Sequence, residues 1–192
     1  MEKAVFLDRD GTLIEDAGYL GERDKIKFLP RVSRAVKLLN ENGFKVIVIT
    51  NQAGVARGYF TEETVRGINE YIQESLIKHV AFIDKFYYCP HHIDGIIEEY
   101  SKECYYRKPN PGMIEKAVGE FDIDLKNSFV IGDKTSDIEA GRRAGCQTIL
   151  LTGEDPPNNG TEIALISDYV TPDLYEAVIW LLELSRQKER QS

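Results

Sequence analysis

Short, continuously apolar segments alternate along this chain with segments of helical periodicity. The apolar segments are Ala4–Leu7, Lys45–Thr50, Ile83–Tyr88, Ser128–Ile131, Thr148–Leu151 and Asp168–Val170. Uninterrupted apolar character, in place of alternating apolar and polar residues, is typical of strands that are buried on both faces. We therefore expect a parallel sheet that helices cover on both sides.

The helical segments carry their apolar residues on one face. Val32, Ala35, Val36 and Leu39 recur at the spacing of a single helix face, and Gly43 follows as a helix stop. Further helices are predicted over Thr61–His79, from Asn110-Pro111 to about Phe121, and after Thr171-Pro172. Strands that alternate with helices form βαβ units. The predicted fold class is α/β, a Rossmann-like parallel sheet with helices on both faces.

Length and charge limit the possible functions. The 192 residues suit a single domain, residues 1–192, with a loop insertion at about 89–109. Lys and Arg number 24 against 32 Asp and Glu, a net charge of −8, which argues against nucleic acid or an anionic membrane as a partner. Three cysteines are too few for a disulfide framework. We see no signal peptide or transmembrane segment, and expect a cytoplasmic monomer.

Polar side chains follow several of the predicted strands. Asp8-Arg9-Asp10-Gly11-Thr12 comes after the first, Thr50-Asn51-Gln52 ends the second, and Gly132-Asp133-Lys134-Thr135-Ser136-Asp137 follows a later one. Ligands of open α/β sheets bind beyond the carboxyl ends of the strands. The sequence therefore predicts a polar site at this edge of the sheet.

Asp8 and Asp10 favour phosphoryl chemistry at a metal ion. Two carboxylates so close would repel one another unless a cation or a shared proton relieved them. Mg²⁺ prefers oxygen ligands, which Asp8, the Asp10 carbonyl and Asp133 would supply. One aspartate could then attack phosphorus while the other protonated the leaving oxygen. Taken alone, the pair also fits a solvated acidic turn.

Four other residues fit the same chemistry. Thr50 offers a hydroxyl to a phosphoryl group, Lys108 a point charge and Arg107 a bidentate fork. Asp137 is placed to cap a helix, to orient Lys108, or to orient the water shell of the metal. Each of these residues also has an ordinary structural explanation. Only their occurrence together favours phosphoryl chemistry.

Together these motifs resemble the haloacid dehalogenase superfamily of aspartyl phosphotransferases. Its four motifs stand here in order, as Asp8-Arg9-Asp10-Gly11-Thr12, Thr50, Lys108 and Gly132-Asp133-Lys134-Thr135-Ser136-Asp137. The resemblance implies the haloacid dehalogenase fold without a large cap domain. It also implies that Asp8 is the nucleophile, that Asp10 is the general acid and base, and that Thr50 and Lys108 stabilise the phosphoryl group.

Four further sequence segments resemble those of the heptose 1,7-bisphosphate phosphatases. Histidinol-phosphate phosphatases share much of this set of segments. The segments are Asp16-Ala17-Gly18-Tyr19, Thr50 to Gly58, Cys89-Pro90-His91-His92 and Arg107 to Met113. By this resemblance, Mg²⁺ is held by Asp8, Asp10 and Asp133. The residues expected to contact substrate are Asp16, Ala17, Gly18, Tyr19, Asn51, Gln52, Ala53, Arg107 and Lys134.

The predicted function is Mg²⁺-dependent hydrolysis of a small phosphorylated metabolite through an aspartyl-phosphate intermediate. Heptose 1,7-bisphosphate is the first candidate substrate and histidinol phosphate the alternative. A phospho-acceptor signalling domain is an alternative of another class. Asp10 argues against it, because slow dephosphorylation requires that no second acid follow the acceptor.

The family's zinc loop is incomplete in this chain. Cys89, His91 and Cys104 match three of the zinc ligands, but Tyr106 stands where the fourth cysteine belongs. A structural zinc site takes four nitrogen or sulfur ligands in a closed tetrahedron. An open zinc site of lower affinity and a metal-free loop with reduced cysteines both remain possible from the sequence.

Overall fold

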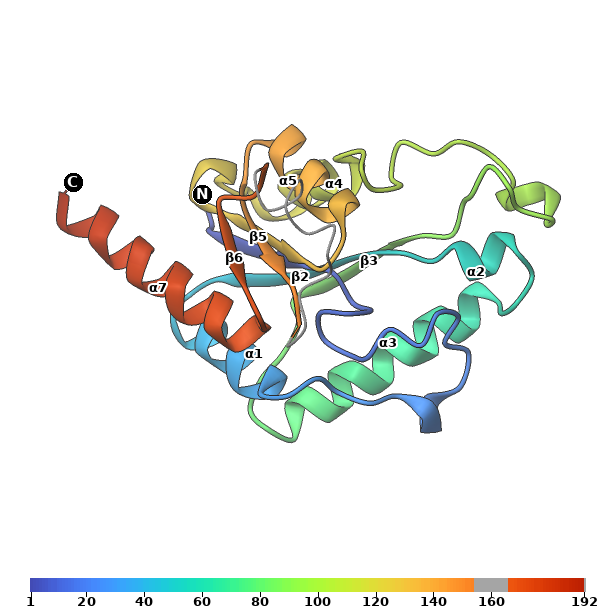
Figure 1. The fold of residues 1–192 in the computed structure, drawn as a ribbon, viewed down its shortest axis with the longest axis horizontal. Helices are drawn as coiled ribbons and strands as arrows, with labels where there is room; N and C mark the ends of the chain where they lie inside the picture. Colours follow the sequence, from blue (N-terminus) through green and yellow to red (C-terminus); the bar gives the residue numbers. More distant parts are fainter. Residues whose placement is uncertain (154–165, 192) are drawn as a thin grey trace.

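A six-stranded, fully parallel sheet forms the centre of the computed structural model, which describes residues 1–153 and 166–191 (Figure 1). Its strands lie in the order β3-β2-β1-β4-β5-β6. They are β1 (Ala4–Leu7), β2 (Lys45–Asn51), β3 (Lys85–Cys89), β4 (Phe129–Gly132), β5 (Gln147–Leu151) and β6 (Tyr169–Thr171). The predicted parallel sheet is confirmed, and every predicted apolar segment contributes a strand to it.

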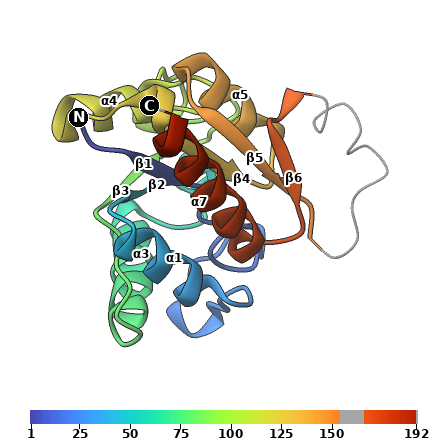
Figure 2. The same cartoon turned by 90° about the vertical axis from the view of Figure 1, so that its left-hand side faces the viewer.

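The helices cover both faces of this sheet, as the sequence predicts. They are α1 (Val32–Glu41), α2 (Ala53–Ala56), α3 (Glu62–Ile77), α4 (Gly112–Phe121), α5 (Thr135–Ala144) and α7 (Leu174–Gln191). Single turns of 3-10 helix, η1 (Arg23–Lys25), η2 (Glu98–Tyr100) and η3 (Leu125–Asn127), lie in the connections. Figure 2 shows α1, α3 and α7 on one side of the sheet and α4 and α5 on the other.

Two apolar cores result, one on each face. Val5 and Leu7 of β1 pack with α1, α3 and α7, whereas Ala4 and Phe6 pack with α4 and α5. Successive strand residues point to opposite faces, so both sets must be apolar in a strand that is covered on both sides. This is the physical reason why the strand segments read as continuous apolar runs.

Some element boundaries differ from the sequence-based expectation. The third strand is shifted to Lys85–Cys89, and the short α2 was not predicted. The N-cap of α4 is Pro111 and not Asn110. The Asn110 side chain instead donates to the carbonyl of Cys104 at 3.4 Å, a tertiary contact that sequence periodicity does not encode.

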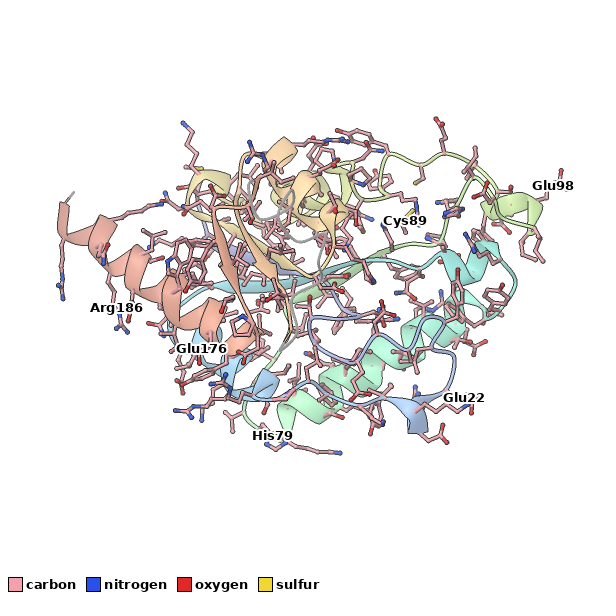
Figure 3. All side chains as sticks on the ribbon, in the orientation of Figure 1. Glu22, His79, Cys89, Glu98, Glu176 and Arg186 are labelled. Atoms are coloured by element: carbon pink, nitrogen blue, oxygen red, sulfur yellow. The ribbon has the colours of Figure 1, made fainter. Side chains whose placement is uncertain are left out.

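The connection between β3 and α4 contains a single turn of 3-10 helix, η2. Figure 3 places Cys89 at its base and Glu98 at its tip. The hydroxyls of Tyr88 and Tyr100 both donate to the carboxylate of Glu62 on α3, at 2.6 and 2.8 Å. Main-chain bonds from Ile96 and Ile97 to the carbonyl of Ala56 tie the tip to α2.

No large cap domain covers the sheet edge within the described residues. The segments from β1 to α1 and from β3 to α4 contain only single 3-10 turns. None of the described helices is both long and apolar enough to cross a lipid bilayer.

Candidate active site

Three carboxylates converge at the carboxyl ends of β1 and β4. Carboxylate oxygens of Asp8, Asp133 and Asp137 all lie within 4.8 Å of one another. Two glycines make this possible. A Cβ at Gly11, where φ is +89°, would lie 2.2 Å from Asp133 Oδ2, and a Cβ at Gly132 would lie 2.3 Å from Asp137 Oδ2. These positions of the motifs therefore cannot carry a side chain without displacing a carboxylate.

Lys108 neutralises part of this negative charge. Its side chain is buried, and Nζ lies 2.8 Å from Asp8 Oδ1, 2.6 Å from Asp137 Oδ1 and 2.7 Å from the carbonyl oxygen of Ile49. Burial alone lowers the pKa of Lys108, but the charges of Asp137 and Asp8 outweigh burial and leave the pKa above its ordinary value. The lysine therefore stays protonated between two carboxylates. Asp137 contacts Lys108 through Oδ1 and also caps α5, because its Oδ2 accepts a hydrogen bond from the Lys134 N–H at 3.1 Å.

Asp133 retains an oxygen without a partner. Its Oδ1 is buried and accepts no hydrogen bond from any described residue. Burial raises the pKa of Asp133 to about 7, and the charge of Asp8 adds to the shift. Buried carboxylates are normally paired or coordinate a metal. An unpaired oxygen beside Asp8 fits a hard divalent cation.

Asp10 points into a different set of contacts. Its carboxylate accepts hydrogen bonds from Arg9 and from Gln52 Nε2, and the same Gln52 nitrogen donates to Thr50 Oγ1 at 2.8 Å. The side chain of Asp10 is therefore outside the cluster of three carboxylates. The expectation that Asp10 offers a metal its carbonyl oxygen and keeps its carboxyl group for proton transfer stays a prediction.

The predicted substrate-contact residues divide into two groups. Gln52 is buried, and its side-chain amide forms hydrogen bonds with Asp10, Thr50 and Arg9. The side-chain amide of Asn51 forms hydrogen bonds with both the N–H and the carbonyl oxygen of Lys108. Ala17, Gly18 and Tyr19 are exposed, Ala53 opens α2, and Lys134 Nζ lies 2.7 Å from Asp16 Oδ2. Gln52 and Asn51 are thus placed to support other site residues, while the second group forms a rim.

Arg107 lies at this rim without a carboxylate partner among the described residues. It donates to the carbonyl oxygen of His91 at 3.1 Å. Burial lowers the pKa of Arg107, and the positive charge of the neighbouring Arg57 adds to this. Arg57 itself has a buried Nε with no hydrogen-bond partner among the described residues, and its guanidinium lies 5.8 Å from the Tyr19 ring. The guanidinium groups of Arg57 and Arg107 therefore lie near one another, and neither forms an ion pair within the described residues.

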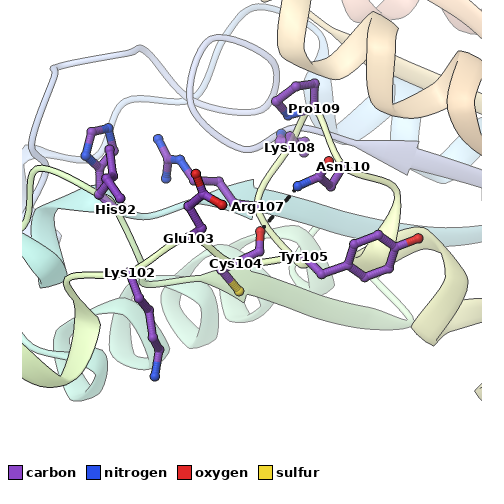
Figure 4. A pocket seen from close by; sticks show the side chains of 10 residues that line it. His92, Lys102, Glu103, Cys104, Tyr105, Arg107, Lys108, Pro109 and Asn110 are labelled. Atoms are coloured by element: carbon purple, nitrogen blue, oxygen red, sulfur yellow. Dashed lines mark hydrogen bonds between the residues drawn. The ribbon is translucent and has the colours of Figure 1, made fainter.

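A cavity of about 560 Å³ opens beside Arg107 and Lys108 (Figure 4). It is lined by residues of the connection from β3 to α4, among them His92, Glu103, Cys104 and Asn110. This connection therefore forms one wall of the approach to the site.

The three predicted zinc ligands also come together. The ligand atoms of Cys89, His91 and Cys104 lie within 4.8 Å of one another, and Cys89 Sγ is 3.7 Å from His91 Nδ1. Burial raises the pKa of the Cys89 thiol to about 12. Tyr106 is exposed and contacts the ring of Tyr105, so within the described residues the cluster has no fourth ligand.

Comparisons with known proteins agree with this geometry. A family model described as HAD-hydrolase-like matches residues 105–177. A D-glycero-D-manno-heptose-1,7-bisphosphate 7-phosphatase from Chlorobaculum tepidum is 40% identical over 183 residues, which are 92% of each chain. The chain belongs to the heptose bisphosphate phosphatase family of HAD-like hydrolases.

Further members of this phosphatase family support the assignment. The Escherichia coli K12 enzyme with the corresponding name, a D-glycero-beta-D-manno-heptose-1,7-bisphosphate 7-phosphatase, is 38% identical over 93% of this chain and 87% of its own. The crystal structure of a D,D-heptose 1,7-bisphosphate phosphatase from B. bronchiseptica, complexed with magnesium and phosphate, matches with a TM-score of 0.80 at 29% identity. It covers 94% of this chain and 98% of its own. The chain is a phosphomonoester hydrolase with the predicted fold.

Sequence reasoning missed three polar residues that surround this phosphatase site, namely Arg9, Asn69 and Arg57, of which Asn69 contacts Arg9 and not the carboxylate cluster. Asn69 lies four residues after Val65, on the apolar face of α3, and both are buried. A polar residue on a buried helix face needs a partner, and this was the one signal that the sequence offered for it. Arg9 and Arg57 lie in sequence motifs in which other residues were assigned the functional roles, so neither was singled out.

Proposed function

We propose that this chain removes the 7-phosphate of D-glycero-D-manno-heptose 1,7-bisphosphate and leaves the heptose 1-phosphate. The observation that carries the substrate assignment is the pair of neighbouring guanidinium groups of Arg57 and Arg107, of which Arg107 directly precedes the buried Lys108. A bisphosphate needs a second anion site next to the reaction centre, and arginine forks suit a phosphate group. The curated relatives that share about 40% identity act on this class of substrate by name.

A Mg²⁺ ion would be held by the carboxylates of Asp8 and Asp133 and by the carbonyl oxygen of Asp10. The unpaired Oδ1 of Asp133 fits such an ion. When bound, it would supply the positive charge that lets an anionic phosphoryl group approach these carboxylates. The related B. bronchiseptica structure, which contains magnesium and phosphate, supports this choice of metal.

The side chains of this chain would then divide the reaction between them. Lys108 engages Asp8 Oδ1, which leaves Oδ2 to form the bond to phosphorus. The ester P–O bond breaks as Asp10 gives its proton to the leaving sugar oxygen. Asp10 then takes a proton from water as the water oxygen attacks phosphorus, which releases phosphate and restores the Asp8 carboxylate. Thr50 and Lys108 hold the phosphoryl oxygens throughout.

The charge at the rim disfavours the alternative substrate. Histidinol phosphate carries a cationic amine and an imidazole, which would lie against Arg57 and Arg107. Asp16, the acidic residue of the predicted substrate segment, is already paired with Lys134. The signalling-domain alternative lacks support, since the relatives are phosphatases and a second acid, Asp10, is present.

Other expectations stay predictions. These are the incomplete zinc site formed by Cys89, His91 and Cys104, the single-domain organisation with an insertion at about 89–109, the monomeric state and the cytoplasmic location.

The experiment is a phosphate-release assay with heptose 1,7-bisphosphate, histidinol phosphate and a generic aryl phosphate, each with Mg²⁺ and with EDTA. We expect the bisphosphate to be preferred and EDTA to abolish every activity. Arg57→Ala and Arg107→Ala should raise KM for the bisphosphate far more than for the aryl phosphate. Arg23→Ala, which removes an exposed arginine paired with Glu70, is the matched control. Equal effects on both substrates would contradict the second anion site.

A further inference from the structure

Arg9 is the largest fully buried side chain among the described residues, and the reaction as derived above gives it no role. It stands between the nucleophile Asp8 and the acid Asp10, and its side chain is 1% exposed. A buried guanidinium is tolerated only when its donors are paired. Its partners therefore indicate what it does.

Arg9 forms a bidentate hydrogen-bonded ion pair with the Asp10 carboxylate through two of its nitrogens. Nε donates to Oδ2 at 3.1 Å, and Nη2 donates to Oδ1 at 3.2 Å. A bidentate fork of this kind fixes the plane of a carboxylate as well as its position. Lysine offers no such geometry, because its ammonium acts as a point charge.

The remaining donors of Arg9 anchor the fork to distant parts of the chain. Nη2 also donates to Gln52 Oε1 at 3.0 Å, and Nη1 donates to Asn69 Oδ1 at 3.2 Å. Asn69 lies on α3 and is 6% exposed. Arg9 thus connects the end of β1 to a helix whose sequence position is 60 residues away.

Gln52 links this hydrogen-bond network to Thr50, the proposed phosphoryl ligand. Its Nε2 donates to Asp10 Oδ2 at 2.9 Å and to Thr50 Oγ1 at 2.8 Å, while its oxygen accepts from Arg9. The acid Asp10 and the phosphoryl ligand Thr50 are therefore held by the same amide. Their relative placement is set by buried hydrogen bonds that do not involve substrate.

We propose that Arg9, anchored by Asn69 and Gln52, is a positioning residue that aims the Asp10 carboxyl group at the leaving oxygen. The proposal rests on the role of Asp10 in the proposed function. It predicts that loosening Arg9 slows the protonation of the leaving group and leaves phosphoryl binding nearly intact. A sugar alkoxide needs that proton, whereas the 4-nitrophenolate leaving group hardly does.

The sharpest variants are Asn69→Ala and Asn69→Asp. Neither changes a residue of the reaction centre, and the aspartate keeps an acceptor oxygen for Arg9 while alanine removes it. We expect Asn69→Ala to lower kcat for heptose 1,7-bisphosphate about 10-fold, a part of the ~10²–10⁴-fold that a positioned acid supplies. Its kcat for 4-nitrophenyl phosphate should change little. Asn69→Asp should recover most of the loss.

Arg9→Lys and Asp10→Asn complete the experiment, with thermal unfolding to confirm that each variant folds. Arg9→Lys should show the same substrate selectivity as Asn69→Ala and a larger loss. If Asn69→Ala lowers both activities equally, or if Asn69→Asp recovers nothing, the positioning role is wrong. If Asp10→Asn itself affects both substrates equally, the acid role of Asp10 in the proposed function fails, and the positioning role fails with it. If only Asp10→Asn is selective, the Arg9 proposal fails alone.

Discussion

The side chain of Asn51 and the main chain of Lys108 exchange two hydrogen bonds. Asn51 Nδ2 donates to the Lys108 carbonyl oxygen, the Lys108 N–H donates to Asn51 Oδ1, and both distances are 3.0 Å. The end of β2 therefore holds the end of the long connection that delivers the lysine. The position of the Lys108 ammonium group, to which we assign a catalytic role, depends on a residue that the sequence suggested only as a substrate contact.

Asn51→Ala should lower kcat by up to about 10²-fold, because a displaced Lys108 no longer fits between Asp8 and the phosphoryl group. The measurement is phosphate release under saturating substrate. Asn127→Ala is the control. Asn127 also donates a side-chain hydrogen bond, to Asp124, but it precedes β4 and so lies at the amino ends of the strands, away from the site. An effect confined to KM would instead favour a substrate contact.

Asp8→Asn should abolish turnover, because an amide oxygen is a poor nucleophile toward phosphorus. Steady-state phosphate release and acid-trapping of a phosphorylated protein check this together. The wild-type chain should yield a trapped phosphoenzyme and the variant none. Near wild-type phosphate release from the variant would rule out the aspartyl-phosphate route.

Glu62→Ala should loosen the connection from β3 to α4. Each of its hydrogen bonds, to Tyr88 and to Tyr100, stabilises this half-buried position by on the order of 1 kcal/mol. Amide hydrogen exchange should become faster at His92, whose N–H is bonded to the carbonyl of Tyr100. Glu63→Ala is the matched control, because Glu63 lies in the same first turn of α3 and is exposed. Unchanged exchange in the Glu62 variant would show that the connection is held elsewhere.

Tyr106→Cys should raise zinc affinity, because it restores the missing fourth ligand beside Cys89, His91 and Cys104. Elemental analysis of protein purified without added metal should find well under one zinc per unmodified chain and close to one in the variant. Unfolding of the variant should become sensitive to chelators, and Tyr105→Cys serves as the neighbouring control. A full equivalent of tightly held zinc in the unmodified chain would contradict the incomplete-site interpretation and require a further ligand.

The sequence predicted the parts of the fold that local pattern determines. Continuous apolar runs such as Ala4–Leu7 identified the strands, and the polar residues at their carboxyl ends identified the site, because parallel strands bring these ends to one edge. The contacts between distant residues were not predictable in this way. Arg9 and Asn69 meet only after α3 has packed on the sheet, and Gln52 turned inward because Asp10 and Thr50 offered its amide partners.

The cap of α4 shows the same limit at a single residue. Asn110 followed by proline is a strong helix-start signal, and the helix does begin nearby, at Gly112. The side chain of Asn110 was drawn away, since its amide nitrogen bonds to Cys104 and its oxygen accepts from Arg143. Both partners lie outside the local sequence window that the prediction used.

Because Gly11 and Gly132 have no Cβ atom, they restrict how this site can evolve. At each position the smallest possible addition, one methyl group, would occupy the volume of a neighbouring carboxylate. A single alanine at either position would therefore displace a carboxylate of the cluster, although no charged residue had been replaced. Glycine at these two positions is therefore as necessary to the carboxylate cluster as the aspartates themselves. Inactive descendants of this chain should be sought among sequences that keep every aspartate but have lost either glycine.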